Sequence, residues 1–142
     1  MDSASIGARI TQEEQLLADT KIECSRAEWK LASLVDYSTY HNRVTTAMSQ
    51  DLLRRRNRLN AEGTDVSGSR TLSALLAGLN ATLQEGEMWL FRRGEQAQRI
   101  RDAITSYEEH VRLLKEQEAE MEESLVGSYC ELAMAHEEEA MG

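Results

Sequence analysis

Histidine and cysteine are the residue types that most often bind metals or act as nucleophiles, and both are sparse in this chain. The three histidines, at positions 41, 110 and 136, lie far apart. None stands three residues after a glutamate, as the E-x-x-H motif of di-iron helical bundles requires. H-E-x-x-H, P-loop and G-x-G-x-x-G motifs are also absent. We therefore predict no enzyme activity, no metal site and no cofactor, and we expect His41 to be a polar core residue.

The two cysteines, Cys24 and Cys130, are 106 positions apart and form no C-x-x-C motif. Buried or free thiols in a reducing compartment fit this spacing better than a disulfide framework.

Aromatic side chains are concentrated in the stretch G-E-M-W-L-F-R-R-G, residues 86–94. It contains one of the two tryptophans and the only phenylalanine of the protein. Exposed aromatic groups are unusual on a soluble helix unless they bind a partner. We expect Met88, Trp89 and Phe91 to form a lateral patch that docks another helix. The alternative is that Trp89 folds back over a weak layer of its own coiled coil.

Arginines are clustered in the stretch L-L-R-R-R-N-R. Residues 42–70 contain six basic and three acidic residues, whereas residues 108–142 contain eleven acidic and two basic ones. Arg54, Arg55, Arg56 and Arg58 are therefore predicted to contact an acidic protein surface. The alternative is that they complement the dipole of a helix end. The net charge of −9 makes nucleic-acid binding unfavourable.

Helices must position these side chains, because the chain contains no proline and proline is excluded chiefly from helix interiors. Residues 63–69, G-T-D-V-S-G-S, have the composition of a turn. Thr11-Gln12-Glu13-Glu14 has the form of a capping box. We expect an all-α fold with an N-terminal tail (1–10), a first long helix (11–62), a turn (63–69) and a second long helix (70–142).

Both predicted helices carry heptad patterns. In the second helix, eight of nine a positions counted from Leu76 are apolar. In the first helix, the a positions run from Ile10 through Leu17, Cys24 and Leu31 to Leu59. Seams of this length are typical of a coiled coil.

The short turn favours an antiparallel hairpin within one chain. Pairing Leu52 with Leu79 brings large residues together and also aligns the weak layers, with Thr45 opposite Gly86. In this register Trp89 lies near Tyr37 and Val44. Trp29, on the outer face of the first helix, provides a second lateral apolar contact. A parallel dimer remains the alternative.

In that register the second helix has no partner beyond about residue 123. We expect this C-terminal overhang to bind another chain or a second copy through its apolar face, which includes Leu125, Tyr129 and Leu132.

No apolar run approaches the roughly 20 residues that a membrane span needs, and residues 1–10 lack the pattern of a secretion signal. We expect a cytoplasmic, non-catalytic coiled-coil subunit that bridges other proteins in a large assembly, cytoskeletal or motor-associated. An export or assembly chaperone that holds a partner helix is the alternative. Whether the hairpin forms a homo-oligomer is left open.

Overall fold

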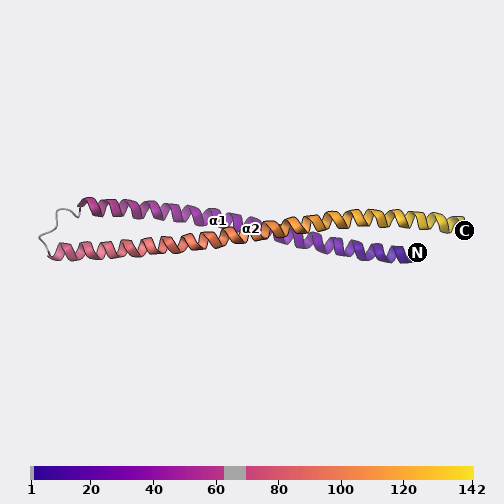
Figure 1. The fold of residues 1–142 in the computed structure, drawn as a ribbon, viewed down its shortest axis with the longest axis horizontal. Coiled ribbons are helices and arrows are strands. Elements are labelled where there is room, and N and C mark those ends of the chain that lie inside the picture. Colours follow the sequence, from indigo (N-terminus) through magenta and orange to yellow (C-terminus); the bar gives the residue numbers. More distant parts are fainter. Residues whose placement is uncertain (1, 63–69) are drawn as a thin grey trace. The chain divides into compact units, whose positions relative to one another are not determined.

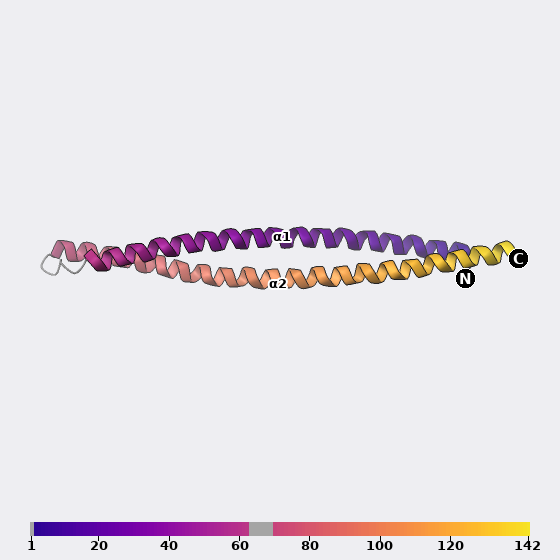
Figure 2. The same cartoon turned by 90° about the horizontal axis from the view of Figure 1, so that it is seen from above.

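A computed structural model describes residues 2–62 and 70–142, so the predicted turn at 63–69 lies outside the described residues. Helix α1 comprises Ser3–Glu62 and helix α2 comprises Arg70–Met141. The two helices are antiparallel and pack against each other (Figures 1 and 2). This arrangement confirms the predicted all-α hairpin. Neither helix contains a stretch that is apolar enough over a sufficient length to cross a bilayer.

Helix α1 begins at Ser3 and not at Thr11, which corrects the predicted tail at 1–10. The Asp2 carboxylate accepts a hydrogen bond from the Ser5 amide at 2.8 Å, which is the geometry of an N-cap. The Glu139 carboxylate of α2 accepts from the Ser3 amide at 3.0 Å and from the Ser3 hydroxyl at 2.8 Å. These bonds lower the pKa of Glu139. The Thr11 hydroxyl donates to the Gly7 carbonyl, so Thr11 lies inside the helix.

The predicted seams are the faces that the helices bury. On α2, the positions from 83 to 135 that alternate by three and four residues are buried or half-buried. On α1, the same spacing marks the less exposed side chains from Ile6 to His41. The heptad assignment is therefore confirmed over these ranges. Nearer the turn, Met48, Leu72 and Leu79 were predicted as seam positions but are exposed.

The register between the seams differs from the predicted one by one heptad. Leu52 lies against Gly86 and not Leu79. Likewise, the Thr45 hydroxyl accepts a hydrogen bond from Arg93, whereas Gly86 was expected opposite Thr45. Both differences are seven residues. A shift by a whole heptad keeps the same faces in contact, and the apolar pattern alone does not exclude it.

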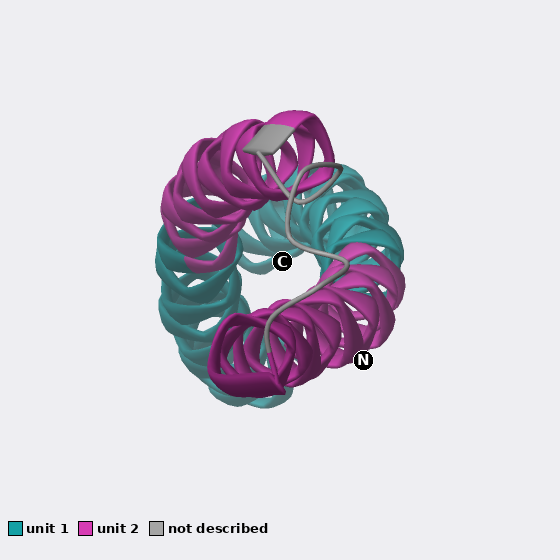
Figure 3. Ribbon diagram, turned by 90° about the vertical axis from the view of Figure 1, so that its left-hand side faces the viewer, with its two compact units in different colours: residues 1–33, 104–142 teal, residues 34–103 magenta. Residues whose placement is uncertain are grey.

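The hairpin divides into two compact units, coloured separately in Figure 3. Unit 1 consists of residues 1–33 and 104–142, and unit 2 consists of residues 34–103. Unit 1 contains two apolar clusters. One is formed by Cys24, Ala27, Val111 and Leu114, with Leu31 packed against it. The other is formed by Ile6, Ile10 and Ala135, with Leu125 and Leu132 packed against it.

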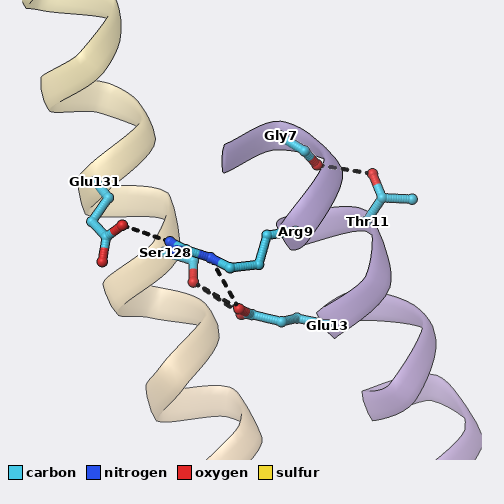
Figure 4. A network of polar contacts seen from close by, with 6 residues as sticks. All are labelled: Gly7, Arg9, Thr11, Glu13, Ser128 and Glu131. Atoms are coloured by element: carbon cyan, nitrogen blue, oxygen red, sulfur yellow. Dashed lines mark hydrogen bonds and ion pairs between the residues drawn. The ribbon is translucent and has the colours of Figure 1, made fainter. Parts of the chain in front are cut away.

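The segment from residue 123 onward, expected to lack a partner, is paired with the start of α1. Besides the Ile6 cluster, polar side chains join the two helices here (Figure 4). Arg9 forms an ion pair with Glu131 at 2.6 Å. The buried Ser128 hydroxyl donates to the Glu13 carboxylate, 3.0 Å away. Residues 3–10, predicted as a tail, supply part of the partner surface, together with Glu13.

The two glycines of the aromatic stretch lie inside continuous helix and have different surroundings. A Cβ atom added at Gly94 would meet nothing within 4 Å. A Cβ atom added at Gly86 would lie 2.8 Å from Leu52 Cδ2. Gly86 thus permits close approach of the helices, whereas Gly94 only lowers the stability of α2.

Gly94→Ala is therefore expected to stabilise the protein by about 0.5–1 kcal/mol, because alanine has the higher helix propensity. Gly86→Ala should stabilise it less, or destabilise it, because Leu52 must move aside. Chemical denaturation of both variants, followed by circular dichroism, measures the difference. Equal gains at the two positions would contradict the close contact with Leu52.

Candidate functional site

Polar side chains replace the apolar seam in the middle of unit 2. This polar layer consists of His41 and Thr45 on α1 and Arg93 and Gln96 on α2. Arg93 donates through Nε to the Thr45 hydroxyl at 2.7 Å and through Nη2 to the His41 carbonyl at 3.2 Å. His41 Nε2 lies 3.4 Å from Gln96 Oε1. The layer binds the two helices to each other at one height.

His41 is the most deeply buried side chain of the polar layer, with 2% of its surface exposed. Its Nδ1 has no hydrogen-bond partner within the described residues. Its ring centre is 6.1 Å from that of Tyr37. The structure thus places His41 in the core, as expected from the sequence.

Trp89 extends the polar layer to the surface. The Arg93 guanidinium lies 4.7 Å from the centre of the Trp89 ring, in a cation–π contact. Trp89 is 36% exposed, so it is only partly available to a partner. A shift of one heptad moves the positions that face Trp89 from Tyr37 and Val44 to Val44 and Asp51, so Val44 keeps its place in the pattern and Tyr37 moves away from Trp89. Trp89 thus packs against Arg93 of its own helix.

Phe91 and Met88 lie on the opposite, outward face of α2. Phe91 is 71% exposed and Met88 is also largely exposed. They continue a stripe of exposed apolar residues at heptad spacing, which we name the α2 outer stripe: Ala74, Ala77, Ala81, Met88 and Phe91. Spacings of three, four, seven and three residues keep these side chains on one side of a helix. The stripe is therefore a second apolar row, interrupted by Gln84, that faces away from the partner helix of the hairpin.

A similar stripe lies on the outward face of α1 in unit 1. It consists of Ala18, Ile22, Trp29 and Ala32, and we name it the α1 outer stripe. Trp29 is 71% exposed, and the other three side chains are exposed as well. The lateral contact predicted at Trp29 thus belongs to an extended surface.

The predicted contacts in the C-terminal segment divide into half-buried and exposed residues. Leu125 and Leu132 are half-buried and pack against the Ile6 cluster. Tyr129 remains 46% exposed. Its hydroxyl donates to the Glu14 carboxylate, and this bond raises the pKa of Tyr129. Of the three, Tyr129 is therefore the most exposed.

The four clustered arginines also have different surroundings. Arg56 turns toward α2, where it forms an ion pair with Glu87 at 2.9 Å and donates to Asn80. Arg55 pairs with Asp51, one turn away on α1, at 3.0 Å. Arg54 and Arg58 have no ion pair with a described residue and line an open groove between the helices of unit 2. Of the four arginines predicted to contact an acidic protein surface, Arg54 and Arg58 are therefore the two without an ion pair to a described residue.

Groups with chemical reactivity are not gathered into one place. Cys24 is buried, and burial is the main reason that its pKa is raised. Cys130 is exposed and also carries a free thiol. Within residues 2–62 and 70–142, no three histidine, cysteine, aspartate or glutamate side chains come together as a metal site would require.

The large side chains of the outer stripes, Met88, Phe91 and Trp29, were predicted as lateral contacts, but the alanines that accompany them were missed. Reading the b and f heptad positions in addition to a and d would have shown these alanines in two adjacent rows. That Arg56 forms an ion pair with α2 while Arg54 and Arg58 do not could be seen only once the register between the helices was known.

Comparisons with family models, with curated proteins and with solved structures find no match to this chain.

Proposed function

We propose that this protein is a non-catalytic coiled-coil subunit that bridges other helical proteins in a larger assembly. The observation that supports this proposal is the pair of outer stripes. Each hairpin helix uses its a and d positions inside the hairpin and also carries a second apolar row outside it. A helix that serves only in a two-helix hairpin needs one apolar row.

The α2 outer stripe suits a partner helix because of the sizes of its side chains. Three alanines allow the backbones of two helices to approach closely, and Met88 and Phe91 then provide large apolar anchors. Aromatic anchors that become buried account for much of the binding energy of many interfaces. The α1 outer stripe, with Trp29 as its anchor, lies in the other unit and offers a second contact. Two separate contacts are what a bridging subunit needs.

The experiment is affinity capture of the full chain from its native source, comparing wild type with a Met88→Ala, Phe91→Ala variant. Because both side chains are exposed, far-UV circular dichroism should not change. Recovery of the partner protein should fall at least tenfold, on the order of 1.4 kcal/mol or more in binding free energy.

Leu53→Ala is the matched control, because Leu53 is an exposed apolar residue of unit 2 that lies on α1. It should leave recovery unchanged. Equal recovery with the Met88→Ala, Phe91→Ala variant and with wild type would exclude the α2 outer stripe as a binding surface. Trp89 is unsuitable for this test, because its loss also removes the cover of Arg93.

A further inference from the structure

The groove that contains Arg54 and Arg58 combines an apolar floor with a basic edge. We name it the arginine groove. Leu59 of α1 and Leu79 and Leu83 of α2 provide apolar surface. Along the α1 side lie Arg54, Arg55 and Arg58. Asp51, the acidic residue of the groove, is already paired with Arg55. The groove therefore fits an amphipathic helix whose apolar residues are accompanied by carboxylates.

The C-terminal part of this chain is a helix of that kind. Its seam positions are used within unit 1, but its outward face carries exposed apolar side chains at heptad spacing. We name this surface the tail face: Val126, Ala133, Met134, Ala140 and Met141. Val126, Ala133 and Ala140 are seven residues apart, as are Met134 and Met141, so they lie in adjacent rows.

Carboxylates accompany the tail face. Glu131 and Glu139 are engaged with Arg9 and Ser3 inside unit 1. Glu137 and Glu138 form no ion pair with a described residue and are exposed. These two glutamates can serve as the acidic partners of Arg54 and Arg58, which form no ion pair with a described residue of unit 2. Residues 42–70 and 108–142 have opposite charge excesses, so the two surfaces attract each other.

We propose that the arginine groove binds the tail face of a second copy of this chain, with Glu137 and Glu138 against Arg54 and Arg58. The apolar side chains of the tail face cover the leucines of the groove, and the charges fix the orientation. The groove and the tail face are different surfaces, so the contact is heterologous unless two copies exchange tails reciprocally. This inference is independent of the outer stripes and of the bridging function.

The test is sedimentation velocity of the full chain over a range of concentrations at low and at high salt. We expect reversible self-association at low salt that weakens as salt is added, because the contact joins opposite charges near the surface. Arg54→Glu with Arg58→Glu should weaken self-association at least about tenfold, since like charges then face each other. Glu137→Arg with Glu138→Arg should have the same effect.

A mixture of the two charge-reversed variants provides the decisive measurement. Each variant alone has like charges at its contact, but in the mixture every groove can meet a tail of opposite charge. Association should therefore return when the two are combined. Arg43→Glu with Arg92→Glu is the control, because it makes the same change in net charge on exposed residues of unit 2 outside the groove.

Three results would overturn the proposal. They are a monomer at all concentrations in low salt, self-association that the groove reversal does not change, and a mixture of variants that stays dissociated. If the protein were monomeric while an added acidic amphipathic helix bound wild type and not the groove variant, the groove would be assigned to a different protein. Circular dichroism of every variant excludes unfolding as the cause.

Discussion

Ile10→Asp is expected to separate residues 3–20 of α1 from residues 121–141 of α2. Ile10 is 5% exposed and packs with Ile6 and Ala135. A carboxylate without a partner at such a position costs about 3–5 kcal/mol, and the lost packing of the isoleucine adds to that cost. Because a domain is stable by only about 5–15 kcal/mol, this single change should remove most of the protection of these segments.

Hydrogen exchange followed by mass spectrometry measures the effect segment by segment. Peptides from residues 3–20 and 121–141 should exchange much faster than in wild type, whereas peptides from unit 2 should change little. Leu16→Asp is the control, because Leu16 lies on the same helix and is 57% exposed. If both variants behaved alike, the pairing of the C-terminal segment with the start of α1 would be wrong.

The hairpin and its seams could be predicted because they depend on periodic features of the sequence. A chain without proline, interrupted by one turn-like segment, predicts two helices. The heptad rows predict which side of each helix is buried, and Val111, Leu114 and Leu83 are buried as that pattern requires. These features repeat over many turns, so local exceptions such as Gly86 do not change the result.

The register could not be predicted in the same way, because it depends on single residues. A helix that starts at Thr11 excludes Ile6 from the buried seam of α1. The C-terminal residues of α2 then have no partner on α1. Asp2 is an equally good cap, and a helix that starts at Ser3 buries Ile6 and Ile10 against α2. Full burial of one such side chain contributes about 1.5–3 kcal/mol. The register that uses the whole length of both seams is therefore favoured.

The candidate surfaces depend on the register to different degrees. The outer stripes follow from each helix alone, so they could have been identified without a structure. By contrast, the roles of the arginines follow from their neighbours on the other helix. The observed register places Arg56 beside Glu87, whereas Arg54 and Arg58 form no ion pair with a described residue.

A disulfide between cysteines at positions 52 and 86 is expected to form within one chain, and a pair at 52 and 79 is not. The native thiols are first removed by Cys24→Ala and Cys130→Ser. Leu52 Cγ, whose place a cysteine sulfur would take, lies 3.6 Å from the Cβ position of residue 86. In a disulfide, whose S–S bond is about 2.0 Å long, each sulfur lies about 3 Å from the partner's Cβ, so a small side-chain adjustment brings the two cysteines into bonding distance. Replacing Leu52 also removes the side chain that crowds position 86.

Mild oxidation followed by mass spectrometry under non-reducing conditions distinguishes the registers. A fast crosslink in the Leu52→Cys, Gly86→Cys variant, with the mass of one chain, supports the register of Leu52 against Gly86. A fast crosslink in the Leu52→Cys, Leu79→Cys variant would instead support the register shifted by one heptad, in which the C-terminal segment extends beyond α1. Crosslinks found only between chains would indicate that the helices pair in a parallel dimer and not in a hairpin. The polar layer predicts the first result, because a shift of one heptad separates Arg93 from Thr45 and leaves the guanidinium in the seam without its hydroxyl partner.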